Sequence, residues 1–197
     1  MTISNKITIS RIVLVPIMIL MIYIPLLRKI ETIFNLDLGE LLFAILFVIA
    51  SFTDFLDGYL ARKRNEITTF GKFLDPIADK VLVLSGMLYI ITYKTTYDWW
   101  WILVVIVLFR EFSVSALRMI AAKEDNVIAA GFSGKLKTVV LMIAMTMILF
   151  NDFGLDHFMN GNAHYISDVL FYLGVALTAY SGFDYIYRNR SAIKIKE

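Results

Sequence analysis

Four aspartates lie in a short stretch between two long apolar runs. They are Asp54, Asp57, Asp75 and Asp79, all within residues 52–80. Placing a carboxylate inside a membrane costs free energy, so such residues are rare and usually have a function. On helices, Asp54 and Asp57 share one face and Asp75 and Asp79 share another, because residues three or four apart lie on the same side. The spacing predicts two acidic stripes that can face each other.

Converging carboxylates repel one another unless cations hold them together. Ligands that are all oxygen atoms favour Mg²⁺, with Mn²⁺ a close second. Two divalent cations about 4 Å apart are a recurring device for phosphoryl transfer, because they neutralise the attacking and leaving oxygens together. The alternative is that these aspartates pair with neighbouring Arg and Lys residues at the helix ends. Four acids in two facing stripes favour a site for divalent cations and phosphoryl chemistry.

Small residues lie on the same stripe as the first two acids. Gly58 and Ala61 follow Asp54 and Asp57 at helical spacing, and they leave room for the atoms of a ligand to approach the helix. The connection between the two acidic segments, residues 63–70, is long enough to turn the chain back. The two helices are therefore predicted to run antiparallel, with all four acids at one end.

The elements that must hold these acids are predicted to be membrane helices. Of the 197 residues, 59% are hydrophobic and only 18% are charged, whereas soluble domains are about half apolar and a quarter charged. A helix needs about 20 apolar residues to cross the hydrocarbon. Six segments qualify approximately: 8–27, 40–60, 74–93, 99–120, 136–151 and 166–187. The first has no small-residue cleavage site and five more follow it, so we interpret it as a helix and not as a signal peptide. We predict a single all-α domain over residues 1–197, an integral membrane bundle of six transmembrane helices.

The placement of lysine and arginine predicts the orientation of the bundle. With the N-terminus inside, only Arg28, Lys29 and Lys94 of the 19 Lys and Arg residues fall outside, and the 151–164 connection has none. The cytoplasmic sides of membrane proteins carry the excess of positive charge. We therefore expect a multi-pass cytoplasmic (inner) membrane protein with both termini and the aspartates at the cytosolic face. That basic face would attract anionic lipids and anionic substrates.

The numbers of cysteine and histidine residues exclude several kinds of catalytic and metal site. The chain has no cysteine, which excludes disulfides, thiolate nucleophiles and zinc or iron–sulfur sites built on its own thiols. Its two histidines, His157 and His164, lie in a polar connection and lack the spacing of a helical metal site. A net charge of only +2 gives no support to nucleic-acid binding.

The acidic segment also carries a longer pattern. It reads DFLDGYLAR, then the eight residues KRNEITTF, then GKFLDPIAD. This resembles the signature of the CDP-alcohol phosphotransferases, which is D-x-x-D-G-x-x-A-R, eight residues, then G-x-x-x-D-x-x-x-D. All eight fixed positions are present at the family's spacing, so the resemblance is specific.

The resemblance implies roles for the signature residues. It implies that the four aspartates bind two divalent cations, Mg²⁺ or Mn²⁺, and that Asp79 is also the general base. The residues implied to lie around the CDP group are Asp57, Gly58, Ala61, Arg62 and Gly71. The start of the chain, NKITISR, resembles the N-terminal segment of one branch of the family, so Asn5 and Thr8 are expected near the nucleotide as well. The family also implies a cytosolic active site and a homodimer.

Basic residues near the acidic site point to the acceptor alcohol. Arginine and lysine on the fourth and fifth predicted helices form a cluster suited to the phosphate of an acceptor, and its members are Arg110, Arg118, Lys135 and Lys137. Arg110 lies inside an apolar run, where an arginine usually has an anionic partner. That partner could also be Glu111 or one of the aspartates. Lys135 and Lys137 could instead be ordinary positive charges flanking a membrane helix.

The REF and GKLKT stretches resemble the family branch that uses glycerol 3-phosphate. The resemblance implies an enzyme that transfers the phosphatidyl group from CDP-diacylglycerol to sn-glycerol 3-phosphate, giving phosphatidylglycerol phosphate and CMP. One alternative is the same chemistry with another acceptor, such as inositol phosphate, serine or a second lipid. A divalent-cation transporter would need acids along a path or near mid-membrane, and a non-catalytic scaffold would not need four converging acids.

Overall fold

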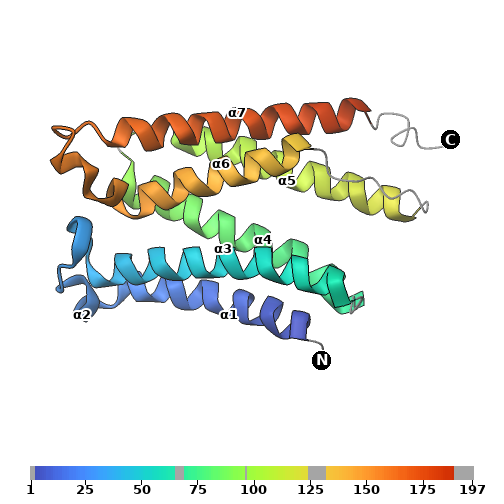
Figure 1. Cartoon of the computed structure of the whole chain (residues 1–197), viewed down its shortest axis with the longest axis horizontal. Helices are drawn as coiled ribbons and strands as arrows, with labels where there is room; N and C mark the ends of the chain where they lie inside the picture. The colour runs from blue at the N-terminus through green and yellow to red at the C-terminus, as the bar shows by residue number, and fades with distance from the viewer. Residues whose placement is uncertain (1–2, 65–68, 96, 124–131, 189–197) are drawn as a thin grey trace.

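The structure is a computed structural model that describes the backbone of residues 3–64, 69–95, 97–123 and 132–188. Within these ranges, side chains are described except at residues 3–8, 54–64, 69–76, 79, 119–123, 132 and 133. The described chain is helical apart from short connections, with a single bridge between Glu31 and Asp37 as its one extended pairing. The predicted all-α class is confirmed (Figure 1).

Six long helices lie in the described ranges, each overlapping a predicted segment. They are α1 (Ile3–Tyr23), α3 (Leu38–Arg64), α4 (Thr69–Tyr89), α5 (Trp100–Lys123), α6 (Phe132–Leu149) and α7 (His164–Arg188). Shorter elements join them at one end of the bundle: α2 (Pro25–Arg28), the 3₁₀ turns η1 (Ile33–Asn35) and η3 (Asn151–His157), and a π turn, η2 (Ile90–Lys94), that extends α4.

Two predicted boundaries were wrong for identifiable reasons. The first helix ends at Tyr23, short of the predicted residue 27, because Pro25 has no N–H to continue it and instead begins α2. The predicted connection over residues 63–70 is shorter at both ends, since α3 continues to Arg64 and α4 begins at Thr69. The sequence there contains no glycine or proline to end a helix early.

The start of α3 is fixed by a reciprocal cap. The Glu40 N–H donates to Asp37 Oδ1 at 2.8 Å, and the Asp37 N–H donates to Glu40 Oε2 at 3.3 Å. This capping box satisfies two backbone donors that have no partner within the helix. The acid-bearing helix is therefore anchored at the end far from its two aspartates.

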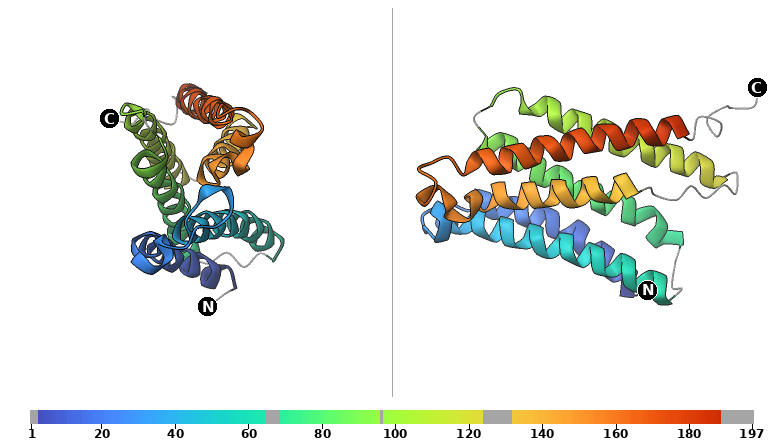
Figure 2. Two further views of the ribbon diagram at one scale, coloured as in Figure 1. Left: turned by 90° about the vertical axis from the view of Figure 1, so that its left-hand side faces the viewer. Right: turned by 45° about the horizontal axis from the view of Figure 1, so that its top comes forward.

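The six helices form a bundle in which α4 connects two groups. Figures 1 and 2 show α1 and α3 side by side in one group and α5, α6 and α7 in the other. The helix α4 contacts members of both groups. Buried apolar side chains fill the centre, among them Phe47, Leu82, Val107, Met145 and Phe171.

Close packing around α4 depends on a glycine. A Cβ atom at Gly86 would lie 2.6 Å from Met145 Cε on α6 and 2.7 Å from Phe47 Cε2 on α3. Both distances are shorter than a van der Waals contact, so a larger residue at this position would displace the Met145 or Phe47 side chain. Small residues at helix contacts are typical of membrane bundles, where close approach replaces the hydrophobic driving force.

The outer faces of the helices are apolar. Large side chains such as Leu20, Phe52, Phe109 and Phe183 are more than 60% exposed. So extensive an apolar exterior identifies a lipid-facing surface. Two described stretches are long and apolar enough to cross a membrane: Trp100–Arg118 and His164–Arg188. A third span results if Gly134–Leu149 and η3, bent by 61° to each other, are taken together. The chain is a membrane protein, and the predicted count of six spans is not confirmed.

Candidate active site

The helix segments that carry the four aspartates lie at one end of the bundle. Asp54 and Asp57 are in the C-terminal half of α3, and Asp75 and Asp79 are in the first half of α4. Figure 1 shows that α3 ends and α4 begins at the same end, where α1 begins and α7 ends. The two helices are antiparallel and in contact, as predicted. The side chains of the four acids lie outside the described residues.

The positions expected around CDP are on the same part of the backbone. The residues Gly58, Ala61 and Arg62 are on α3, Gly71 is on α4, and Asn5 and Thr8 are in the first two turns of α1. The helix α1 packs along both α3 and α4, so it runs beside both acid-bearing helices. The side chains of these six residues also lie outside the described set. Their contacts with the nucleotide stay a prediction.

A buried ion cluster joins α5 to α6 next to this end. The Arg110 Nη1 atom donates to Glu111 Oε1 at 3.1 Å, and the Lys137 ammonium donates to the same carboxylate oxygen. Arg110 is 9% exposed and Lys137 is 6% exposed. Two cations on one carboxylate leave a net positive charge of one. The partner of Arg110 is thus Glu111, one of the alternatives that the sequence allowed.

This cluster adjoins the acidic helix. Lys80 follows Asp79 directly on α4 and lies near enough to Glu111 for their charges to attract. Lys80, Glu111 and Lys137 line one small cavity between α4, α5 and α6. The fold therefore brings Glu111 and Lys137 close to Lys80, the residue that follows Asp79. The helix spacing alone could not show this, because it depends on which helices are neighbours.

Arg110 is held from a third helix. Its Nη2 atom donates to Ser181 Oγ on α7 at 3.0 Å, and the Ser181 hydroxyl donates in turn to the Thr178 carbonyl at 3.0 Å. Its Nε atom is buried and has no hydrogen-bond partner among the described residues. The stem of Arg110 passes α7 at Gly182, where a Cβ atom would lie 2.5 Å from Arg110 Cγ.

The close passage at Gly182 predicts a stability effect. We expect Gly182→Ala to displace Arg110 and to lower the free energy of unfolding by about 1–3 kcal/mol, because an extra methyl group overpacks the contact. The measurement is the thermal unfolding midpoint of the purified protein in detergent. Gly134→Ala is the matched control, since its Cβ would lie 3.9 Å from Arg110 Nη2, an ordinary contact. Equal midpoints for the two variants would contradict the prediction.

The other two basic residues are accessible. Arg118 is exposed, and its guanidinium lies 5.4 Å from the centre of the Tyr185 ring on α7, a distance at which the cation and the ring attract. Its charge also acts on Arg110, so the two arginines of α5 are near each other. Lys135 is exposed near the start of α6. The structure thus divides the four predicted residues into a buried pair and an exposed pair.

Three residues of α7 contact the basic cluster and were not predicted from the sequence to do so. Ser181, Gly182 and Tyr185 contact the two arginines from the last helix. Their spacing, three or four residues along one face, is a pattern that could have been found. Nothing in the sequence indicated that this face meets α5.

Comparison with known proteins decides the family. Residues 1–180 match the family described as CDP-alcohol phosphatidyltransferase. This chain belongs to that family. A Bacillus subtilis (strain 168) relative is 37% identical over an alignment of 194 residues that covers 96% of each chain, and it is named CDP-diacylglycerol–glycerol-3-phosphate 3-phosphatidyltransferase. Relatives with the same name occur in Wigglesworthia glossinidia brevipalpis, 31% identical over 96% of this chain and 99% of the relative, and in Haemophilus influenzae, 34% identical over 91% and 88%. The family resemblance of the signature is confirmed.

Proposed function

We propose that this chain transfers the phosphatidyl group of CDP-diacylglycerol to sn-glycerol 3-phosphate. The observation that carries the proposal is the nearly full-length similarity to relatives named for that donor and acceptor. The basic cluster on α5 and α6 supports it, because an acceptor with a phosphate needs cations beside the acidic site. The products are phosphatidylglycerol phosphate and CMP.

In the proposed reaction, a hydroxyl of glycerol 3-phosphate attacks the phosphorus that bears the diacylglycerol. The new P–O bond forms as the bond to CMP breaks, and the hydroxyl proton is lost. We propose that Asp79 accepts this proton, since it is the last acid of the signature. Catalysis of this kind is mostly positioning and charge neutralisation, and the helix ends allow the acyl chains to stay in the bilayer.

The donor set fits two divalent cations. Asp54, Asp57, Asp75 and Asp79 offer only carboxylate oxygens, the ligands that Mg²⁺ and Mn²⁺ prefer, and they lie on two antiparallel helices in contact. When bound, such cations neutralise the charge of the pyrophosphate. Among the described residues, no group of three or more His, Cys, Asp or Glu side chains could hold a metal ion. We propose, from the signature and the spacing of the acids, that both cations bind the four aspartates, whose side chains lie outside the described residues.

Exposure suggests different tasks for the four basic residues. We propose that Arg118 and Lys135, which are exposed, contact the acceptor phosphate directly. Arg110 and Lys137 are buried on Glu111, so we assign them to maintaining a positive potential and positioning α5 against α6. We also propose that the chain is a single domain with six membrane spans and a cytosolic active site, because of its apolar segments and the distribution of lysine and arginine. Membership of the family supports a homodimer.

The acceptor assignment is tested by Arg118→Ala. We expect the KM for glycerol 3-phosphate to rise about ten- to hundredfold while the KM for CDP-diacylglycerol changes little, because one charged hydrogen bond contributes roughly 1.5–3 kcal/mol. Initial rates with purified protein and varied substrates measure both constants. Arg28→Ala is the control, an exposed arginine at the other end of the bundle. If both KM values stay unchanged in Arg118→Ala, Arg118 is only a flanking charge. A panel of alcohols with labelled CDP-diacylglycerol, scored by product, tests the whole proposal.

A further inference from the structure

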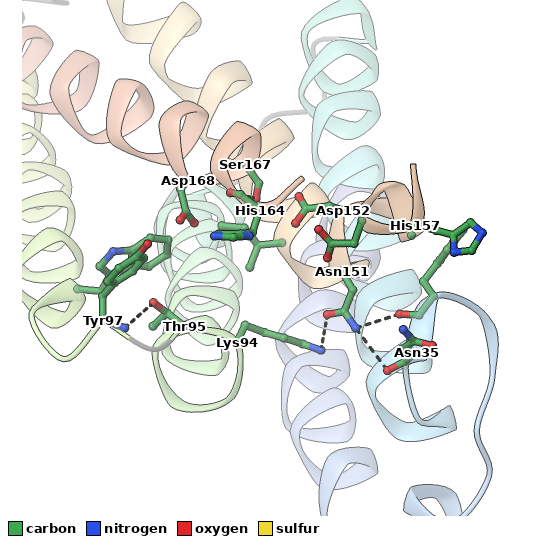
Figure 3. A pocket seen from close by; sticks show the side chains of 15 residues that line it. Asn35, Lys94, Thr95, Tyr97, Asn151, Asp152, His157, His164, Ser167 and Asp168 are labelled. Carbon is green, nitrogen blue, oxygen red and sulfur yellow. Dashed lines mark hydrogen bonds between the residues drawn. The ribbon is translucent and has the colours of Figure 1, made fainter. Parts of the chain in front are cut away.

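A polar cavity lies at the end of the bundle opposite the four aspartates. Its volume is about 440 Å³, within the range of small-molecule sites. It is bounded by η1, the residues after η2, the start of α5, η3 and the first turn of α7 (Figure 3). The proposed transfer reaction uses none of its lining residues, so a ligand in this cavity would have a role separate from that reaction.

Carboxylates dominate the charge of this cavity. Asp152 is 5% exposed and Asp168 is 9% exposed, and both line it together with Asp156. Figure 3 shows the Asp152 and Asp168 side chains on the same side of the Lys94 side chain, with Ser167 and His164 between them. Buried carboxylates this close to each other need a cation or hydrogen-bond donors.

One oxygen atom of these carboxylates lacks a hydrogen bond, although the Asp152 carboxylate as a whole interacts with Ser167. The Oδ1 atom of Asp152 is buried and accepts no hydrogen bond from the described residues. A buried polar atom without a hydrogen bond destabilises the fold, so it points to a donor that binds here. Asp152 is held beside the cavity by its neighbour, since Asn151 Nδ2 donates to the Phe34 carbonyl at 3.0 Å and to the Asn35 carbonyl at 3.4 Å.

Lys94, the lysine that lines the cavity, forms its hydrogen bonds with residues other than Asp152. The Lys94 ammonium donates to Glu40 Oε1 at 3.2 Å and to Asn151 Oδ1 at 3.0 Å. Among the described residues, neither Lys nor Arg forms an ion pair with Asp152 or Asp168. Lys94, already paired with Glu40, therefore does not neutralise Asp152 or Asp168, and His164 is a lining residue whose charge acts on both carboxylates.

The cavity wall also presents aromatic rings. Tyr97 stacks on Trp100 with ring centres 5.7 Å apart, and both line the cavity. Burial and the charge of Asp168 raise the pKa of Tyr97, so its hydroxyl stays neutral beside that carboxylate. Trp100 is buried between the Tyr97 and Phe171 rings, both of which stack on it, so it is the Tyr97 ring that can face a ligand. Aromatic rings attract organic ammonium groups.

We propose that this cavity binds an ammonium group, with Asp152 and Asp168 as its counter-ions and the Tyr97 ring, backed by Trp100, as its aromatic wall. A directly ligated metal ion is disfavoured, because the described residues contain no group of three or more His, Cys, Asp or Glu that could hold one. The ammonium belongs either to a soluble amine or to the headgroup of an aminophospholipid, since the cavity is at the end of the bundle.

The test uses the full chain in nanodiscs that contain only phosphatidylglycerol. All three tryptophans are residues 99–101, and Trp100 lines the cavity, so a ligand in the cavity should change the tryptophan fluorescence. Ethanolammonium chloride is titrated against its neutral analogue ethylene glycol at constant ionic strength. We expect a saturable change with the ammonium and none with the diol, and an affinity about tenfold or more lower in Asp152→Asn and Asp168→Asn. Asp98→Asn, an exposed acid at the same end that does not line the cavity, should bind like the wild type.

Several results would overturn the proposal. They are the absence of a saturable response in the wild type, an equal response to ethylene glycol, and an unchanged affinity in both cavity variants. A saturable response to Mg²⁺ but not to ethanolammonium would show a metal site instead. The wild-type comparison of amine with diol needs no variant, so it decides the matter even if Asp152→Asn does not fold.

A second arm separates the two sources of the ammonium. The titration is repeated in nanodiscs that also contain phosphatidylethanolamine. If this lipid weakens the binding of free ethanolammonium, the lipid headgroup occupies the cavity. If the affinity is unchanged, the cavity selects a soluble amine.

Discussion

Asp54→Ala and Asp75→Ala are each expected to abolish phosphatidyl transfer. Each variant removes one carboxylate from a predicted two-cation site, in which metal ions supply several kcal/mol of charge stabilisation. A loss of that size corresponds to about 10³-fold or more in rate. The measurement is the formation of phosphatidylglycerol phosphate from labelled CDP-diacylglycerol by purified protein. A chelator should likewise silence the wild type until Mg²⁺ or Mn²⁺ is restored.

The control for these variants is an acid at the same end of the bundle that lies outside the signature. Asp184 on α7 pairs with Arg188 through a 2.6 Å contact, and Asp184→Ala should keep nearly full activity. Thermal unfolding midpoints show whether Asp54→Ala and Asp75→Ala still fold. Full activity of the wild-type protein in chelator would contradict the two-cation site, whatever the variants do.

Asp79→Asn should separate proton removal from metal binding. A carboxylate has a reference pKa of about 4 and is a weak base for a free alcohol, so the proton is expected to move late, as the new bond to phosphorus acidifies the hydroxyl. The amide keeps an oxygen that can ligate but loses the basic group. If accepting the proton is the main role of Asp79, kcat of the Asp79→Asn variant falls by about 10²–10⁴, while CDP-diacylglycerol and metal still bind.

The comparison variant for Asp79→Asn is Asp75→Asn. It makes the same chemical change at an acid proposed only as a ligand, so nucleotide binding and turnover should fall together. If nucleotide binding also collapses in Asp79→Asn, Asp79 is chiefly a ligand. A fall in kcat of less than about tenfold would show that the base is another group. Equilibrium binding of CDP-diacylglycerol and steady-state rates measure the two effects separately.

The sequence by itself determined the family, the class of fold and the chemistry of the acids. A helix repeats every 3.6 residues, so the spacing of Asp54, Asp57, Asp75 and Asp79 places each pair on one face without any tertiary information. The apolar segments likewise locate six helices, because their composition alone meets the length of a membrane helix. The ends of these helices are harder to predict. Pro25 marks the end of the first helix, whereas residues 63–70 contain no glycine or proline that would mark where one helix ends and the next begins.

Only the tertiary structure decided which side chains meet. Arg110 was predicted to have an anionic partner, and Glu111, which follows it on α5, was one of the candidates. The hydrogen bond from Arg110 to Ser181 requires α5 to lie against α7, where the absence of a side chain at Gly182 leaves room for the Arg110 stem. Similarly, Asp152 and Asp168 share a cavity because η3 and the start of α7 fold over the end of the bundle. Contacts between helices depend on the shapes of many packed side chains together, and no periodicity within one segment records them.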